Sequence, residues 1–129
     1  LALPKLGATV IDTWNNEPNV DVELVDVVDI ATPHIAGYSY QGKQMGTAMA
    51  VRAVARHFGI EALYDFFPDD EPDHEPVHLD LHGKNHGQIA AVFQYNYPIF
   101  TDDFRFRMEP HKFEKLRSDY QYRREIYVE

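Results

Sequence analysis

The sequence of 129 residues contains no cysteine. Disulfide bonds, thiolate metal sites and a cysteine nucleophile are therefore excluded for these residues, and the absence fits a reducing cytoplasm. Long apolar runs are also missing: no stretch approaches the roughly 18 residues that cross a bilayer, and no basic-then-apolar leader opens the chain. We therefore expect a cytoplasmic protein without a membrane partner.

Positive charge is scarce as well. The chain has 12 Lys and Arg against 21 Asp and Glu, a net charge of −9. The imbalance is confined to the part up to Phe100, with 5 basic against 14 acidic residues, because the remainder carries 7 of each. Nucleic-acid binding needs a basic surface, so we expect no nucleic-acid partner.

The residues that are present are those of a folded globular chain. The apolar fraction is 44% and the charged fraction is 26%, both near the averages of globular domains. A chain of this length can bury one modest core.

The first half of the chain shows short apolar segments followed by a helical pattern. Pro33 interrupts the second of these segments, and Gly59 follows the helical pattern in the position of a C-cap. The predicted elements are, in order, a buried strand over 8–14, a short helical turn over 20–28, a second short strand over 29–35 and an amphipathic helix over 42–58.

The second half begins after a segment without apolar pattern. Residues 68–76 hold three prolines and five acidic residues and read as a linker. Beyond it, period-2 alternation and helical spacing predict an α+β arrangement. Its elements are a half-buried strand over 77–82, helices over 87–97 and 110–120, and a closing strand over 124–129.

Two short motifs contain the candidate catalytic residues. Residues 12–18 read Asp-Thr-Trp-Asn-Asn-Glu-Pro, and His34 follows Glu17 by 17 positions within Thr-Pro-His-Ile-Ala-Gly-Tyr over 32–38. A carboxylate and an imidazole near adjacent strand ends can move a proton near neutral pH. Seven histidines and 21 acids also create accidental pairs, so a histidine with a purely structural role is the alternative.

In this order, the two motifs resemble the D-isomer-specific 2-hydroxyacid dehydrogenase family. In that family an aspartate–hydrophobic–aromatic strand leads into Glu-Pro, and Pro-His-Ile-(Ala/Gly)-Gly follows. The short gap between the motifs and the Phe-Glu-Lys-Leu-Arg segment over 113–117 resemble one branch, which acts on a small phosphorylated hydroxy acid. The resemblance is closest over 12–46 and 113–125.

The resemblance implies an oxidoreductase that uses NAD. It assigns His34 as the acid/base that takes the substrate hydroxyl proton and Glu17 as the residue that orients it. It places Asp12 at the nicotinamide end of NAD, Gly37 against the cofactor and Tyr38 against the substrate. The residues alone leave alternatives open: Asp12 caps a strand end, Gly37 serves a turn, and Tyr38 packs at the surface.

Two parts that the family needs are missing. No Gly-x-Gly-x-x-Gly turn seats a pyrophosphate, and neither Arg52 nor Arg56 has the context of the arginine that clamps the substrate carboxylate. The chain also begins at Leu1 rather than at a methionine. We therefore expect the C-terminal part of a longer enzyme, inactive alone because orientation and electrostatic stabilisation would be lost.

A second hypothesis is association, because the resemblance implies a homodimer formed through the C-terminal region. The apolar side of the strand over 77–82 and the small-residue helix over 42–58 need covering, and a two-fold partner is one solution. Packing of the same faces within one chain is the alternative.

A third hypothesis concerns metal binding. His74, His78, His82 and His86 recur at four-residue intervals, and Asp80 lies between two of them. Such ligands would suit zinc. Solvated histidines on a polar face explain the same pattern, so we assign no metal.

The predicted fold class is an α/β remnant, the last strands of a Rossmann-like domain, followed by an α+β domain. The predicted parts are the end of an NAD-binding domain over 1–41, a connecting helix over 42–67, an acidic linker over 68–76 and a dimerisation domain over 77–129.

Overall fold

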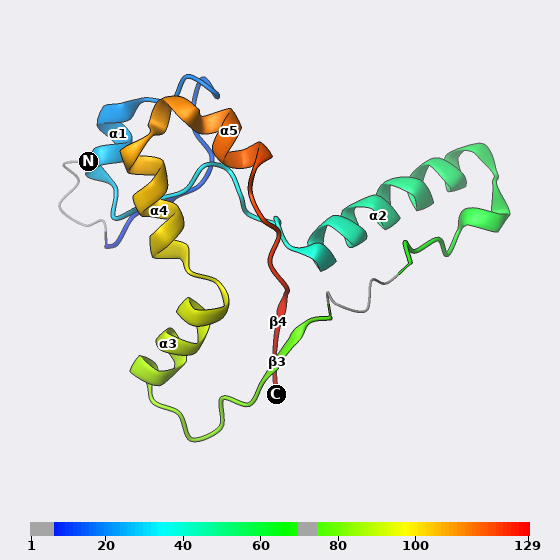
Figure 1. Ribbon diagram of the computed structural model, residues 1–129. Helices are drawn as coiled ribbons and strands as arrows, with labels where there is room; N and C mark the ends of the chain where they lie inside the picture. The colour runs from blue at the N-terminus through cyan, green and yellow to red at the C-terminus, as the bar shows by residue number, and fades with distance from the viewer. Residues whose placement is uncertain (1–6, 70–74) are drawn as a thin grey trace. The chain divides into compact units, whose positions relative to one another are not determined.

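The computed structural model describes residues 7–69 and 75–129 as helices and two small parallel sheets (Figure 1). The chain divides into two compact units. Unit 1 combines Leu1–Ala36 with His86–Gln121, and unit 2 combines Gly37–Asn85 with Tyr122–Glu129. No helix in the described part of the chain is long and apolar enough to cross a membrane.

Unit 1 begins with a strand, a helix and a parallel strand. β1 (Val10–Ile11) pairs with β2 (Ile30–Ala31), and α1 (Val22–Val27) forms the crossover that a parallel pair requires. Asp21 caps α1, because its carboxylate accepts a hydrogen bond from the backbone N–H of Leu24 at 3.2 Å. The two predicted strands and the helical turn between them are confirmed, each shorter than predicted.

Three further helices complete unit 1. The predicted helix over 87–97 is confirmed as α3 (His86–Asn96). The predicted helix over 110–120 is a short 3-10 helix (Pro110–Lys112) that continues into α5 (Phe113–Ser118). The sequence pattern did not predict α4 (Ile99–Met108), which contributes to the core.

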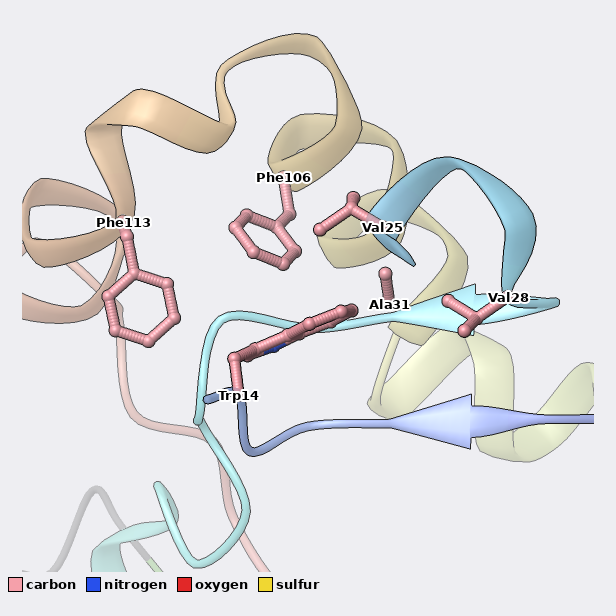
Figure 2. Close-up of a cluster of buried hydrophobic side chains, with 6 residues drawn as sticks. All are labelled: Trp14, Val25, Val28, Ala31, Phe106 and Phe113. Carbon is pink, nitrogen blue, oxygen red and sulfur yellow. The ribbon is translucent and has the colours of Figure 1, made fainter. Parts of the chain in front are cut away.

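The core of unit 1 is built around aromatic side chains (Figure 2). The ring of Phe106 is fully buried and lies edge-on to Trp14, with a centroid distance of 5.4 Å. Phe113 extends the cluster at 5.8 Å from Phe106. Such pairs add to the free energy gained from burial. The buried cluster comprises Trp14, Val25, Val28, Ala31, Phe106 and Phe113.

This core explains why the compact units do not follow the chain in order. α4 and α5 contribute Phe106 and Phe113 to the same buried cluster as Trp14. Residues 86–121 therefore group with the N-terminal residues. The predicted division placed residues 77–129 in one part. The observed grouping differs from it, and the domain boundaries stay a prediction.

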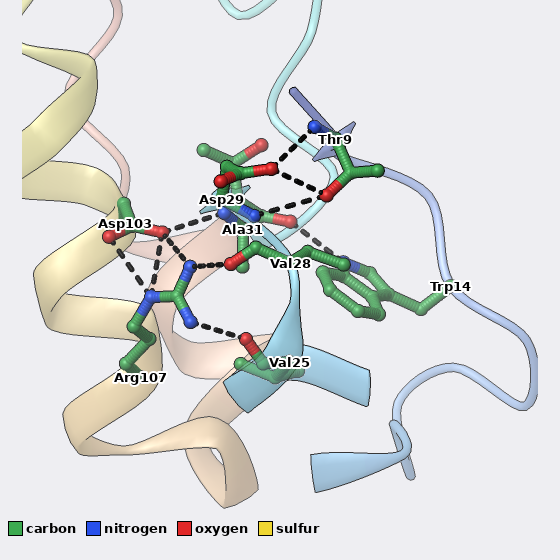
Figure 3. Close-up of polar contacts among 9 residues, drawn as sticks. Thr9, Trp14, Val25, Val28, Asp29, Ala31, Asp103 and Arg107 are labelled. Atoms are coloured by element: carbon green, nitrogen blue, oxygen red, sulfur yellow. Dashed lines mark hydrogen bonds and ion pairs between the residues drawn. The ribbon is translucent and has the colours of Figure 1, made fainter. Parts of the chain in front are cut away.

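A polar brace joins α4 to the βαβ segment (Figure 3). Arg107 donates to the carbonyl oxygens of Val25 at 2.5 Å and Val28 at 2.7 Å, which lie at the end of α1. It also pairs with Asp103, which accepts the backbone N–H of Ala31 at 2.6 Å. These contacts give hydrogen-bond partners to two carbonyls at the end of α1 and to one backbone N–H of β2.

Unit 2 contains the long helix α2 (Tyr40–Phe58). Its start is fixed by Ser39, whose hydroxyl accepts the N–H of Gly42 at 2.9 Å. Its end is fixed by Gly59, whose φ of 69° is left-handed. The predicted helix over 42–58 is confirmed and begins two residues earlier, because Ser39 caps it. Beyond a 3-10 turn (Glu61–Leu63), the chain is held near α2 by Arg52, which donates to the carbonyl of Phe66 at 2.7 Å.

The second sheet also lies in unit 2. β3 (Val77–Leu79) pairs in parallel with β4 (Ile126–Val128). Both predicted strands are therefore present and shorter than their predicted ranges. Most of the predicted linker over 68–76 cannot be compared, because residues 70–74 lie outside the described residues.

The fold class is thus a mixture in which helices dominate and both sheets are small and parallel. This is compatible with the predicted α/β remnant. A sheet of two strands with two residues each does not define a Rossmann domain, so that assignment stays a prediction.

The core makes a direct stability prediction. We expect Phe106→Ala to lower the free energy of unfolding by about 3–5 kcal/mol, because it removes a buried ring and leaves a cavity. Phe104→Ala on the same helix is the control, since Phe104 is 63% exposed and its loss should change stability by about 0.5 kcal/mol or less. Urea unfolding of both variants measures the difference, and equal effects would contradict this account of the core.

Candidate active site

Glu17 and His34 meet within unit 1. Each follows one of the two paired strands, and the carboxyl ends of parallel strands lie at the same edge of a sheet. Nδ1 of His34 lies 2.7 Å from Oε2 of Glu17. The His34 side chain is 40% exposed and that of Glu17 is 21% exposed. The pair predicted from the sequence is therefore formed, at a position that solvent reaches.

The second oxygen of Glu17 fixes the orientation of the pair. Oε1 accepts the backbone N–H of Trp14 at 2.8 Å. Because an ionised carboxylate only accepts hydrogen bonds, Nδ1 of His34 must donate, and in the neutral ring Nε2 then carries the lone pair. No hydrogen bond to Nε2 occurs within the described part of the chain. The arrangement leaves Nε2 as the proton acceptor of a partly exposed ring.

The pKa of Glu17 lies below its ordinary value of 4.5. Partial burial by itself raises this pKa. The hydrogen bonds from His34 and from the backbone N–H of Trp14, together with the charge of Arg117 and that of the His34 ring when it is protonated, outweigh burial. Glu17 is therefore ionised near neutral pH and serves as the fixed negative partner of the imidazole.

Asp12 anchors the loop that carries His34. Its Oδ1 accepts the hydroxyl of Thr32 at 2.7 Å and the N–H of Ile35 at 2.8 Å, and its Oδ2 accepts the N–H of Ala36 at 3.0 Å. These contacts support the alternative that Asp12 caps the end of its strand. A contact with NAD stays a prediction.

The backbone of His34 is held in an unusual conformation. Its φ is +56°, a left-handed value that costs a non-glycine residue roughly 1–2 kcal/mol. Such a conformation persists only where the surroundings determine it. Gly37 has a φ of +79°, and a Cβ built there would meet nothing within 4 Å. Backbone conformation alone accounts for glycine at 37, and its cofactor contact stays a prediction.

Tyr38 belongs to unit 2, where it packs among aromatic rings. Its ring lies edge-on to Tyr122 at 5.7 Å, and the Lys43 ammonium lies 3.6 Å from its centroid. A cation over an aromatic face is attractive. The packing alternative for Tyr38 is supported, and its substrate contact stays a prediction.

Sequence reasoning missed three residues that support the pair. The indole N–H of Trp14 donates to the buried carbonyl of Thr32 at 2.8 Å and so ties the two motifs together. Arg117 donates from Nε to the carbonyl of His34 at 3.1 Å. Trp14 and Thr32 stand inside the quoted motifs and could have been found there. Nothing in the sequence spacing signals that Arg117 reaches a residue 83 positions earlier.

Three of the four histidines at four-residue intervals, His78, His82 and His86, lie within the described residues. His78 contacts Glu129 at 3.1 Å, with both side chains exposed. His74 lies outside the described residues. Within residues 7–69 and 75–129, no group of three or more His, Cys, Asp or Glu could hold a metal ion.

Comparison with known proteins gives these motifs a context. The chain is 38% identical over 120 residues to an erythronate-4-phosphate dehydrogenase of Bacteroides fragilis and 40% identical over 120 residues to that of Bacteroides thetaiotaomicron. The Porphyromonas gingivalis enzyme is 36% identical over 123 residues. The chain is homologous to erythronate-4-phosphate dehydrogenases. No family model matches it.

The alignment covers most of this chain but only part of each relative. The alignment to the Bacteroides fragilis protein covers 93% of this chain and 32% of that erythronate-4-phosphate dehydrogenase. The chain thus spans about a third of the length of the curated relatives it matches. The relatives are dehydrogenases by name, which agrees with the family resemblance of the two motifs.

The lowered pKa of Glu17 makes stability depend on pH. A carboxyl group with a lowered pKa in the folded state stabilises that state above its unfolded pKa, and the contribution is lost as pH falls through the folded value. We therefore expect the unsubstituted chain to be more stable than Glu17→Gln at neutral pH, by about 1.5–3 kcal/mol for a hydrogen bond to a charged group. The difference should shrink below pH 4.5.

Urea unfolding at a series of pH values measures this difference. Glu61→Gln, at an exposed position of unit 2, is the control and should follow the unsubstituted chain. Curves for Glu17→Gln that run parallel to the unsubstituted chain through the acid range would contradict the ionised pair.

Proposed function

We propose that this chain supplies the acid/base histidine of an NAD-dependent erythronate-4-phosphate dehydrogenase. The reaction oxidises 4-phospho-D-erythronate to 2-oxo-3-hydroxy-4-phosphobutanoate, a step of vitamin B6 biosynthesis. The observation that carries the proposal is the 2.7 Å contact between Glu17 and Nδ1 of His34, in a chain homologous to enzymes of that name.

The geometry suits proton removal from an alcohol. Nε2 of His34 accepts the proton of the hydroxyl next to the substrate carboxylate while the hydrogen on the same carbon leaves as hydride. NAD, when bound, supplies the hydride acceptor. Glu17 stabilises the imidazolium that forms and holds the ring in one tautomer. A partly exposed imidazole beside a fixed carboxylate is what this step requires of the chain.

The contacts of Asp12 and Gly37 with NAD stay predictions. Asp12 accepts three hydrogen bonds from its own chain, whereas the open space at Gly37 leaves room for a cofactor. No Gly-x-Gly-x-x-Gly turn occurs in the 129 residues. We therefore assign no step to cofactor contacts of this chain, and we expect the chain alone to be inactive.

Two alternatives remain from the sequence. One is oxidation of another D-2-hydroxy acid by the same pair. The other is a homodimerisation module over 77–129 without catalysis. The second is supported by exposed apolar side chains on α4, where Phe100, Phe104 and Met108 recur every four residues.

A chimera tests the proposal. The segment of the Bacteroides fragilis relative that aligns with this chain is replaced by the chain itself, which restores the remaining two-thirds of a curated enzyme. NADH formation is then followed with 4-phospho-D-erythronate and with unphosphorylated D-2-hydroxy acids. We expect turnover of the phosphorylated substrate, and a loss of roughly 10²–10⁴-fold in kcat for His34→Asn. His57→Asn at an exposed position of α2 is the matched control.

The outcomes separate the alternatives. Preference for an unphosphorylated acid would favour a sibling dehydrogenase. A folded chimera that turns over no substrate, or one in which His34→Asn behaves like His57→Asn, would contradict the assignment of His34.

A further inference from the structure

We propose that Arg117 is a positioning residue of the candidate active site, which from α5 holds the backbone of His34 so that its ring meets Glu17. The inference rests on the proposed function, because positioning matters to catalysis only if His34 moves the proton. It adds to the family motifs a residue from the distant 113–117 segment.

The core places Arg117. Phe113, one helical turn earlier, is buried against Phe106 and anchors α5. Residues four apart lie on one face of a helix. The guanidinium carbon of Arg117 accordingly lies 5.7 Å from the centroid of the Phe113 ring. The buried ring of Phe113 thus fixes the place at which the Arg117 side chain leaves α5.

The decisive contact is with a single peptide group. Nε of Arg117 donates to the carbonyl of His34 at 3.1 Å, and the N–H of Ile35 donates to Asp12 at 2.8 Å. This carbonyl and this N–H belong to the same planar peptide unit. A cation therefore holds its oxygen and an anion holds its nitrogen. With both ends held, the peptide plane cannot rotate.

The carbonyl carbon of this peptide is one of the four atoms that define φ of His34, and φ sets where the imidazole lies relative to the preceding backbone. His34 has a φ of +56°, which an L residue adopts only when its neighbours impose it. A return to negative φ would turn the carbonyl group and the Cβ of His34 together about the N–Cα bond. It would therefore break the hydrogen bond from Arg117 and move the ring away from Glu17. Arg117 and Asp12 together prevent this. The guanidinium is also one of the charges that favour the ionised form of Glu17.

The test compares the His34 ring in variants of the 129-residue chain. Nitrogen NMR of the imidazole shows which ring nitrogen carries the proton. We expect one tautomer in the unsubstituted chain, a mixture of two in Arg117→Met, and an intermediate mixture in Arg117→Lys, because lysine keeps the charge on a flexible stem. Arg105→Met, an exposed arginine of α4, removes the same charge and should leave the ring signals unchanged.

Each outcome decides the proposal. Ring signals of Arg117→Met identical to those of the unsubstituted chain would overturn it. If Arg117→Met does not fold, solvent exchange of the Nε–H protons in the unsubstituted chain decides instead. Exchange roughly tenfold slower at Arg117 than at Arg105 supports the hydrogen bond, and equal exchange overturns it. These readouts need no turnover, so an inactive chimera would count against the proposed function without touching this result.

Discussion

The indole of Trp14 takes part in both the core and the candidate site. Its ring is buried against Phe106, its side-chain N–H binds the carbonyl of Thr32, and its backbone N–H binds Glu17. One residue thereby connects the packing of α4 to the loop before His34 and to the carboxylate that orients it. The position of the candidate site follows from the burial of this side chain.

The contacts around His34 show how a small unit maintains a strained residue. The left-handed backbone of His34 is unfavourable by itself. Asp12 and Arg117 act on the peptide that follows it, while Glu17 acts on its ring. The energetic cost is offset by charge-assisted hydrogen bonds, which are stronger than neutral ones. The ring is thereby held with Nε2 available as the proton acceptor.

Much of this arrangement is visible in the sequence because it depends on local signals. Short apolar segments, Gly59 and the spacing of apolar residues located the strands and α2. The motifs located Glu17 and His34, and their contact is confirmed. Roles toward NAD or substrate at Asp12, Gly37 and Tyr38 depend on groups outside this chain, and no local pattern can establish them.

The helix α4 and the role of Arg117 could not be predicted from the sequence because they depend on long-range packing. In α4 the side chains of Phe104, Phe106 and Met108 alternate with arginines, a period-2 pattern typical of a strand. Tertiary contacts favour the helix instead, since Phe106 reaches Trp14 and Arg107 reaches the end of α1. Arg117 likewise gains its role only through folding, because 83 positions separate it from His34.

The central claim is that a fixed carboxylate makes His34 a proton acceptor at Nε2. The most direct test is the nitrogen NMR spectrum of the His34 ring in the unsubstituted chain, recorded where the imidazole is neutral. The account predicts that the proton resides on Nδ1, facing Glu17, and that Nε2 carries none. A proton on Nε2, or the tautomer mixture of a free histidine, would contradict it.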